Sequence, residues 1–382
     1  MAANIENAFD GLDTPCLLLD RARLDGNIAR FDSKAKALGV GLRTHMKTAK
    51  SLEVAARIPS VATNGITVST LKEAEHFAAG GVADILLAVC IPPQKVARAA
   101  ALMRSGTALK LAVDDAAALA ALQRTAREEQ TTLDVLVEVD CGEHRSGVAA
   151  DSDELVALAS ELDGDEWTRF AGVYTHGGHS YGASSNDERL TIARAERDAV
   201  LEAAERLRTA GLDCPIRSVG STPTFACVDA LDGITETRPG VYVFGDLFQA
   251  GIGSCEMTDI ALSVLTTVIG SRSDARRLLV DAGGLALSKD RSTASLGDGD
   301  CGYGLVCDLA GAPLQGLQVT DAYQEHGVIN LPPWSKTDDF PVGTRLRVLP
   351  NHSCMTAAAH DRYQVLDDGE VVATWSRVNA WD

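Results

Sequence analysis

A lysine stands two residues after a strand-like segment near the start of this sequence. The segment is Val40–His45, and Lys47 follows it in the run Arg43-Thr44-His45-Met46-Lys47-Thr48. A lysine at the end of a buried strand can form a Schiff base with an aldehyde or ketone. The alternative is an ordinary solvated lysine, and the residues around other strand ends have to decide between the two.

Two later strand-like segments run into glycine- and hydroxyl-rich turns. The first turn is Val219–Thr224 and the second is Arg238–Tyr242. Glycine lets the backbone approach an anion closely, and hydroxyl and N–H groups donate hydrogen bonds to it. Either turn alone reads equally well as an ordinary tight turn. Together, and in company with Lys47, they predict a bound pyridoxal 5′-phosphate (PLP), which carries both a phosphate and an aldehyde.

Two more strand ends carry groups that suit a planar, anionic cofactor. Arg145 can donate to an anionic ring oxygen, or simply pair with Glu143. Tyr174 and His176 lie at the end of the next strand and Tyr181 follows it, where aromatic rings can stack on a cofactor or donate to its phosphate. A histidine satisfied within the core is the alternative for His176.

A possible metal site lies near the C-terminus, in Pro350-Asn351-His352-Ser353-Cys354-Met355-Thr356. Residues two apart in an extended chain point to the same face, so His352 and Cys354 can share one metal ion. Imidazole and thiolate suit Zn²⁺ and related divalent ions. Two ligands leave positions open for water or substrate, although an H-x-C pair is common without any metal. His326 is a further candidate that spacing alone does not place.

The elements that must position these groups alternate between short strands and amphipathic helices. Eight such strands indicate a parallel (β/α)8 barrel, in which function gathers at the carboxyl ends of the strands. The expected strands are Val40–His45, Gly65–Ser69, Asp84–Val89, Ala108–Val113, Leu133–Asp140, Phe170–His176, Ile216–Gly220 and Ile234–Arg238.

The pattern changes after about residue 250, where strands follow one another with few long helical periods. The expected strands there are Ile260–Ile269, Arg277–Val280, Arg345–Leu349, Tyr363–Leu366 and Val371–Trp375, joined by one at Cys16–Leu19. We therefore predict a barrel domain over residues 22–250 and a β-rich domain over residues 1–21 and 251–382 that carries the metal pair. Segments 288–302 and 330–341 are expected to be loops.

Composition narrows the function further. The chain of 382 residues has 35 basic and 53 acidic residues and a net charge of −18, which disfavours nucleic acid and anionic membranes as partners. No apolar run has the roughly 20 residues of a membrane helix, and no secretory signal is visible. Nine widely spaced cysteines do not resemble a disulfide framework, so a cytoplasmic enzyme is expected.

Taken together, these motifs resemble the fold-type III PLP enzymes, the alanine racemase-like superfamily. The resemblance covers nearly the whole chain and is strongest to the metal-dependent branch of D-serine dehydratase, D-threo-3-hydroxyaspartate dehydratase and D-threonine aldolase. It rests on the Lys47, phosphate-turn and H-x-C motifs already quoted, and on Asp13-Thr14-Pro15, Gly65-Ile66-Thr67-Val68-Ser69-Thr70 and Tyr174-Thr175-His176-Gly177-Gly178. Thr44 departs from the proline usual in the first motif but leaves Lys47 in register.

The resemblance implies a role for each site residue. Lys47 would carry the cofactor as a Schiff base, and Arg145 would lie near its phenolic oxygen. His176 would lie against the ring, and Arg238 would face the pyridine nitrogen. The remaining contacts implied are to the phosphate from Ser221, Thr222, Gly240 and Val241, to the cofactor from Tyr174 and Tyr181, and to the metal from His352 and Cys354.

By the same resemblance we expect a lyase that removes water from a D-3-hydroxy amino acid, giving a 2-oxo acid and ammonia. Lys47, desolvated and close to cationic groups, would take the Cα proton, and a divalent metal (Zn²⁺, or Mn²⁺, Mg²⁺ or Co²⁺) would help hydroxide to leave. The H-x-C pair resembles the dehydratases, whereas aldolases usually carry H-x-D. A 3-hydroxyaspartate substrate needs a cation for its second carboxylate, and the candidates are Arg43, Arg145 and Arg291.

Three alternatives stay open. The first is a D-threonine-type aldolase that yields glycine and an aldehyde, and the second is a non-catalytic PLP carrier. A carrier is disfavoured by the long C-terminal domain with its metal pair. Racemisation is disfavoured because it needs no metal. The family further implies a homodimer.

Overall fold

The computed structural model describes residues 8–381, and the chain divides into two compact units. One unit comprises residues 29–240 with residues 380–381, and the other comprises residues 8–28 and 241–379. The domain boundaries predicted above stay a prediction. Within the described residues, no helix has both the length and the apolar character needed to cross a lipid bilayer.

The first unit is built on eight parallel strands in the order β2-β10-β9-β8-β6-β5-β4-β3. His45, just after β2, forms a parallel bridge with Thr67 of β3, so the run of strands closes into a barrel. The strands are β2 (Gly41–Leu42), β3 (Ile66–Val68), β4 (Asp84–Leu87), β5 (Ala108–Val113), β6 (Leu133–Asp140), β8 (Thr168–Tyr174), β9 (Ile216–Val219) and β10 (Glu236–Thr237), with β7 (Val148–Ala149) paired to β6.

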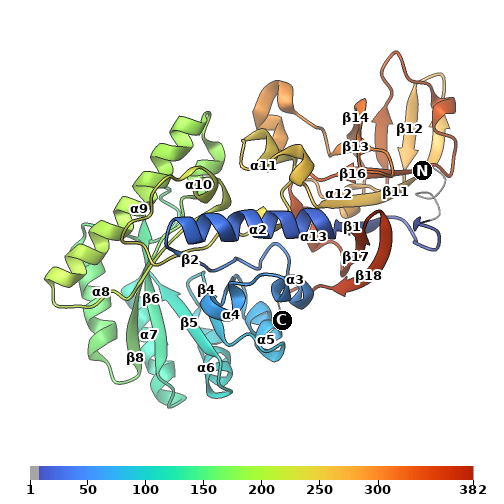
Figure 1. Ribbon diagram of the computed structural model, residues 1–382. Coiled ribbons are helices and arrows are strands. Elements are labelled where there is room, and N and C mark those ends of the chain that lie inside the picture. The colour runs from blue at the N-terminus through green and yellow to red at the C-terminus, as the bar shows by residue number, and fades with distance from the viewer. Residues whose placement is uncertain (1–7, 382) are drawn as a thin grey trace. The chain divides into compact units, whose positions relative to one another are not determined.

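Helices follow these strands and lie outside them (Figure 1). Several begin at a side-chain cap: Thr70, Asp115, Ser152 and Ser185 each accept a backbone N–H three residues on. The helical elements are α2 (Arg21–Ala37), which begins in the other unit, α3 (Leu52–Ala56), α4 (Val61–Asn64), α5 (Leu71–Ala79), η1 (Pro93–Lys95), α6 (Val96–Arg104), α7 (Ala116–Glu128), α8 (Asp153–Gly164), η2 (Gly178–Gly182), α9 (Asn186–Thr209) and α10 (Thr222–Cys227).

The second unit is a mainly antiparallel sheet in the order β12-β15-β14-β13-β16-β11-β1-β17-β18. An extra pairing of β12 with β11 closes six of these strands into a ring. The strands are β1 (Cys16–Asp20), β11 (Leu262–Arg272), β12 (Arg277–Val280), β13 (Leu305–Cys307), β14 (Pro313–Ala322), β15 (Gly327–Asn330), β16 (Arg345–Leu349), β17 (Arg362–Asp367) and β18 (Glu370–Ser376).

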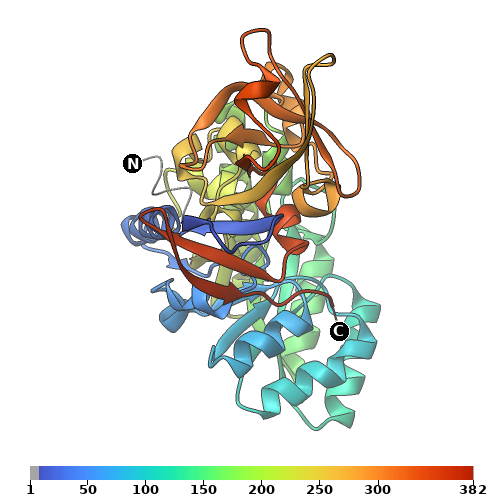
Figure 2. The ribbon, with the colours of Figure 1, turned by 90° about the vertical axis from the view of Figure 1, so that its right-hand side faces the viewer.

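Strand β1 comes from the start of the chain but lies in the middle of this sheet. It runs antiparallel to β11 and parallel to β17, and Figure 2 shows it in blue beside the red β17–β18 hairpin. The short helical elements of the unit are η3 (Val241–Val243), α11 (Leu247–Gly251), η4 (Met257–Asp259), α12 (Gly284–Leu287), η5 (Ser292–Gly299), η6 (Thr337–Asp339) and α13 (Ser353–Ala358).

These two architectures confirm the predicted fold class, a (β/α)8 barrel with a β-rich domain. The expected barrel strands are all present, within a few residues at their ends. The structure adds β13, β14 and β15, which the sequence did not suggest, and the 3-10 helices η5 and η6 inside the two segments expected to be loops. The first part of β14, up to Gly316, has no buried residue, so the apolar alternation of a half-buried strand is confined to the short stretch from Leu317.

Candidate active site

A cavity of about 360 Å³ lies at the carboxyl ends of the barrel strands, within the size range of small-molecule sites. Each of the eight barrel strands, or the loop that follows it, contributes to its wall. The lining residues are His45, Lys47, Ser69, Ala88, Val89, Cys90, Asp114, Glu138, Arg145, Ser146, Tyr174, His176, Gly220 and Arg238. The structure thus brings five of the predicted cofactor residues into one pocket.

Lys47 lies in the turn after β2 and is exposed at the pocket wall. The burial that we expected for it is therefore wrong. Its backbone N–H donates to His45 Nδ1, at 3.4 Å. Burial, with Lys47 as the next cause, lowers the pKa of His45 well below its usual value, so this imidazole is neutral at pH 7.

His176 is held by a hydrogen bond to the loop after β9. Its Nδ1 lies 3.1 Å from the carbonyl oxygen of Gly220, which can only accept, so Nδ1 carries the hydrogen and Nε2 is left with a free lone pair. Burial and the nearby Lys47 lower the pKa of His176 to about 3. A neutral imidazole therefore faces the pocket throughout the physiological pH range.

A buried glutamate on α9 ties together the loops after β8 and β9. Glu196, only 2% exposed, accepts the backbone N–H groups of Gly177 at 2.6 Å and of Gly220 at 3.0 Å. Burial raises the pKa of Glu196, although these hydrogen bonds oppose the effect. Because Gly177 follows His176 directly, Glu196 fixes the backbone on both sides of the His176–Gly220 contact.

The predicted phosphate residues are not among those that line the cavity, but they form one connected group beside it. Ser221 Oγ lies 3.2 Å from Ser180 Oγ, next to Tyr181 in the sequence, and Thr222 Oγ1 accepts the Gly240 N–H at 3.3 Å. Val241 follows Gly240 and begins η3. The two turns are thus adjacent, as a phosphate held by both would require.

Gly220, between this group and the pocket, has a backbone that only glycine suits. Its φ is +123°, and an added Cβ would lie 2.5 Å from Thr237 Oγ1 and 2.8 Å from the Arg238 nitrogen. Its N–H donates to Glu196 and its carbonyl is paired with His176, so this glycine is held in the pocket wall by protein contacts. The cavity volume, the lysine in its wall and the hydroxyl groups of the adjacent turns all fit PLP.

Arg238 and Tyr174 form a buried stack in the pocket. The guanidinium lies 5.1 Å from the centre of the Tyr174 ring and donates to Ser218 Oγ, the Val219 carbonyl and the Thr175 carbonyl. Arg238 is therefore rigidly held and can only donate. The Tyr174 hydroxyl donates to Glu138 Oε2 at 2.8 Å, so it already has a protein partner.

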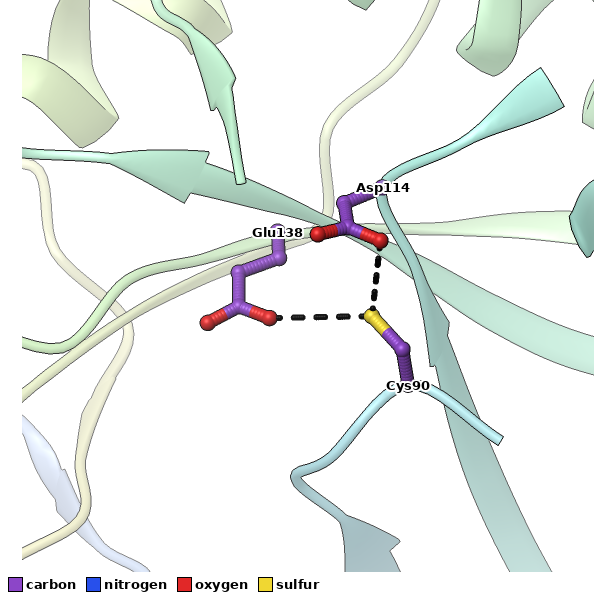
Figure 3. A group of neighbouring side chains, drawn as sticks. All are labelled: Cys90, Asp114 and Glu138. Carbon is purple, nitrogen blue, oxygen red and sulfur yellow. Dashed lines mark hydrogen bonds between the residues drawn. The ribbon is translucent and has the colours of Figure 1, made fainter. Parts of the chain in front are cut away.

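A thiol and two carboxylates lie together in the pocket wall (Figure 3). Among the described residues, Cys90, Asp114 and Glu138 are the group whose potential ligand atoms all lie within 4.8 Å of one another. Cys90 Sγ donates to Asp114 at 3.1 Å and approaches Glu138 at 3.7 Å. Burial and these carboxylates raise the pKa of Cys90 well above its usual value, so the thiol keeps its proton.

The carboxylates of this cluster also hold the loop that carries Arg145. Ser146 Oγ donates to Glu138 at 2.8 Å, and the Gly147 N–H donates to Asp114 at 3.0 Å. Both donors follow Arg145 in the chain. The cluster therefore positions the loop after β6 with neutral hydrogen-bond donors.

The three arginines considered for a second substrate carboxylate have different environments. Arg43 is buried and paired with Glu236 and Asp84, which begin β10 and β4, so it is committed to the opposite end of the barrel. Arg291 pairs with Asp300 in the β-rich unit. Arg145 lines the pocket, its side chain is 55% exposed, and its pairing with Glu143 is long, at 3.5 Å.

The metal pair lies where α13 begins in the β-rich unit. His352 is the residue before α13 and Cys354 lies in its first turn, so the extended geometry that we expected for them is wrong. The pair still converges, because the Cys354 side chain is a hydrogen-bond partner of the His352 imidazole. Imidazole and thiol donors fit a divalent metal. His326 lies elsewhere, in the exposed turn between β14 and β15.

Buried hydrogen bonds hold the backbone of this pair. Asp246, which is 1% exposed, accepts the Ser353 N–H at 3.0 Å and the Gln249 N–H at 2.7 Å, and Ser353 Oγ donates to the Gly245 carbonyl at 2.5 Å. Burial raises the pKa of Asp246 to about 6. A second carboxylate, that of Asp290, lies 2.9 Å from His352 Nδ1.

The sequence analysis missed the supporting carboxylates Glu196, Asp246 and Asp290. One of them left a signal: Glu196 falls on the apolar face of α9 between Ala193 and Val200, where an unpaired charge would be costly. Asp246 and Asp290 stand in irregular segments, and spacing does not connect either of them to the metal pair.

Two family descriptions match the chain and together cover most of it. Residues 19–247 match "Alanine racemase, N-terminal domain", and residues 261–366 match "Putative serine dehydratase domain". The two matched ranges contain the barrel pocket and the metal pair, respectively.

Named relatives align over nearly the full chain. D-threo-3-hydroxyaspartate dehydratase of Delftia sp. (strain HT23) is 46% identical over 97% of this chain and 98% of its own length. D-serine dehydratase of Dictyostelium discoideum is 30% identical over 98% of both chains. 3-Hydroxy-D-aspartate aldolase of Paracoccus denitrificans (strain Pd 1222) is 30% identical over 96% of this chain and 93% of its own.

Solved structures agree with these alignments. That of the Delftia sp. HT23 dehydratase matches with a TM-score of 0.93 over 97% of this chain and 99% of its own. A cysteine-to-alanine variant of D-threo-3-hydroxyaspartate dehydratase, described as the metal-free form, matches with a TM-score of 0.94 over the same shares at 46% identity. The chain therefore belongs to the alanine racemase-like family of fold-type III PLP enzymes, in the branch that contains the metal-dependent D-serine and D-threo-3-hydroxyaspartate dehydratases.

Proposed function

We propose that this chain is a PLP- and metal-dependent lyase that removes water from a D-3-hydroxy amino acid, either D-threo-3-hydroxyaspartate or D-serine. The products would be a 2-oxo acid and ammonia. The observation that carries the proposal is that one chain combines a lysine in a strand-end pocket with a converging imidazole–thiol pair. The 46% identity to a D-threo-3-hydroxyaspartate dehydratase supports it.

When bound, PLP supplies an electron sink for negative charge at Cα, and the divalent metal supplies a Lewis acid for the departing hydroxyl. Lys47 would hold the cofactor, and its exposed amine would take the Cα proton in the reaction. His176, neutral and fixed through Nδ1, would pack against the ring without adding positive charge. Arg238 can only donate hydrogen bonds, so opposite the pyridine nitrogen it would keep that nitrogen unprotonated.

The remaining predicted residues would bind rather than react. Arg145 would donate to the phenolic oxygen, and Tyr174 and Tyr181 would contact the cofactor. Ser221, Thr222, Gly240 and Val241 would surround the phosphate with hydroxyl and backbone N–H donors. His352 and Cys354 would hold the metal, for which Zn²⁺, Mn²⁺, Mg²⁺ and Co²⁺ are the candidates.

Of the three arginines considered, Arg145 is the one that could also serve a second substrate carboxylate in this pocket. Arg43 is committed to two acids elsewhere, whereas Arg145 lines the cavity and is loosely paired. This supports a 3-hydroxyaspartate substrate over D-serine. We also propose a homodimeric, cytoplasmic protein, as the family resemblance implies, and light scattering of the purified protein would test the dimer.

The second candidate is an aldolase, favoured by the 30% identity to 3-hydroxy-D-aspartate aldolase. The test is to incubate PLP- and metal-loaded protein with D-serine, D-threonine and both D-3-hydroxyaspartate diastereomers, and to assay oxo acid, ammonia, glycine and aldehyde together. Equimolar oxo acid and ammonia would support the dehydratase. Glycine with an aldehyde would show that the enzyme is an aldolase instead. Bound PLP without any turnover would support the non-catalytic PLP carrier.

A further inference from the structure

Asp290 lies beside the metal pair although it is 62 residues from His352 in the chain. It follows α12 in a segment that was expected to be a loop. Its Oδ2 lies 2.9 Å from His352 Nδ1, and both side chains are partly shielded from solvent, being 21% and 37% exposed. This is a direct contact between the loop and the predicted metal ligand.

The Asp290 carboxylate is itself fixed in place. The backbone N–H of Ser292 donates to Oδ1 at 2.8 Å, and the Ser292 hydroxyl donates to the same oxygen. The backbone N–H of Asp290 donates to Ser288 Oγ at 2.9 Å. With Oδ1 occupied by Ser292, Oδ2 is the oxygen presented to the imidazole.

This arrangement determines which imidazole nitrogen can bind a metal. An ionised carboxylate only accepts hydrogen bonds, so His352 Nδ1 must carry the hydrogen. Nε2 is then left with the lone pair, and the Cys354 thiol is within hydrogen-bond reach of the same ring. Carboxylates that hold a metal-bound histidine in this way fix its tautomer and its orientation, and they raise its basicity.

We propose that Asp290 is a positioning residue for the metal site, which directs His352 Nε2, together with Cys354 Sγ, toward the divalent ion. Asp246 has a different role, because its carboxylate oxygens accept hydrogen bonds from the backbone N–H groups of Ser353 and Gln249. One carboxylate thus holds the backbone of the turn and the other holds the imidazole. The inference rests on the metal pair of the proposed function but not on which reaction the enzyme catalyses.

The test is metal binding by the full-length, PLP-loaded protein, measured by titration calorimetry with Co²⁺ and Zn²⁺. We expect Asp290→Asn to weaken binding about 10–100-fold, the range typical for loss of such a partner, and Asp290→Ala to weaken it at least as much. Asp298→Asn is the matched control, because it makes the same change of charge at an exposed position in the same loop. An Asp290→Asn affinity equal to that of the control would overturn the proposal.

A spectroscopic readout separates positioning from direct ligation. At saturating Co²⁺, the thiolate-to-metal charge-transfer band of Asp290→Asn should match that of the wild type, since His352 and Cys354 remain the ligands. A changed coordination number at saturation would make Asp290 a ligand and overturn the positioning role. Ser292→Ala keeps the charge and removes one donor to Asp290, so it should weaken Co²⁺ binding a few-fold. If the Asp290 variants do not fold, the Co²⁺ affinity of Ser292→Ala becomes the test. An affinity equal to that of the wild type would then overturn the proposal.

Failure of the metal site itself would look different. His352→Ala should abolish specific Co²⁺ binding. If it binds Co²⁺ as tightly as the wild type, the metal pair of the proposed function is wrong, whatever Asp290 does. Because the titration involves no turnover, a substrate assay that points to the aldolase leaves this result unaffected.

Discussion

The barrel pocket and the turn that holds the predicted metal ligands, His352 and Cys354, differ in how the chain assembles them. The pocket is lined by residues at the ends of eight strands, from His45 to Arg238, and no single segment dominates it. The metal pair occupies one turn, and its two residues are separated only by Ser353. That turn is supported by a few hydrogen bonds to Asp246 and Asp290. A site spread over many strands should keep its shape when one lining side chain changes, whereas a site in one turn depends on each of its few supports.

The largest expected effect is on turnover, when the pocket lysine Lys47 is replaced. Lys47→Ala should lower kcat at least about 10³-fold, because one amine would hold the cofactor and move the proton. Since Lys47 is exposed, the fold and the metal affinity should stay as in the wild type. Steady-state kinetics and Co²⁺ titration check both statements. Lys36→Ala, which removes a 73% exposed lysine from the outside of the barrel unit, is the control. Activity within tenfold of that control would exclude the role of Lys47.

Removing the metal from His352 and Cys354 should lower turnover but leave cofactor binding in the barrel pocket unchanged. Chelation, or Cys354→Ala, should reduce kcat by about 10²–10³, which corresponds to the several kcal/mol that a Lewis acid contributes. The visible absorbance of the bound cofactor should not change. Added Zn²⁺, Mn²⁺, Mg²⁺ or Co²⁺ should restore the chelated wild type, and Cys301→Ala is the control for loss of a half-buried thiol in the same unit. Full activity after exhaustive chelation would contradict the proposed function.

A smaller effect, on stability, is expected when the buried carboxylate of Glu196, which holds the pocket loops, is replaced. Glu196→Gln replaces an acceptor of two N–H groups by an amide, so it should lower the free energy of unfolding by about 1–3 kcal/mol. It should also weaken PLP binding, because Gly220 is no longer fixed. Urea denaturation and PLP titration measure the two effects, with the exposed Glu202→Gln on the same helix as the control. Equal stabilities for the two variants would show that the pocket loops do not depend on Glu196.

The smallest expected effect is on pH dependence. The pKa of His176 is about 3 in the folded state and near 6.5 in the unfolded state, so below pH 6.5 the unfolded state binds more protons. Stability from this group is present at pH 7 and is lost as the pH falls. Between pH 7 and pH 5 the loss should be about 1–2 kcal/mol in the cofactor-free protein. His176→Asn should reduce the pH dependence of urea denaturation by that amount. An identical pH dependence in wild type and variant would mean that His176 is not held neutral.

The same contrast explains what sequence alone could and could not predict. Strands β5 and β6 were predicted correctly because their apolar runs are buried for most of their length. Lys47 and the two glycine turns could be found because the barrel topology says where strand ends meet. Asp290 could not, because its contact with His352 depends on how an irregular loop folds. The clustering of Cys90, Asp114 and Glu138 likewise follows from three separate strand ends that spacing does not connect.

Strand β1 has a consequence for biosynthesis. Its partners are β11 and β17, so a ribosome must make residues 262–367 before Leu17, Leu18 and Leu19 can be covered within the sheet. The barrel strands are complete by residue 237 and can pair while translation continues. During that interval β1 is an apolar strand with unpaired edges, and such edges promote aggregation. Chaperone binding to the emerging N-terminal segment should therefore last until the C-terminal hairpin has left the ribosome.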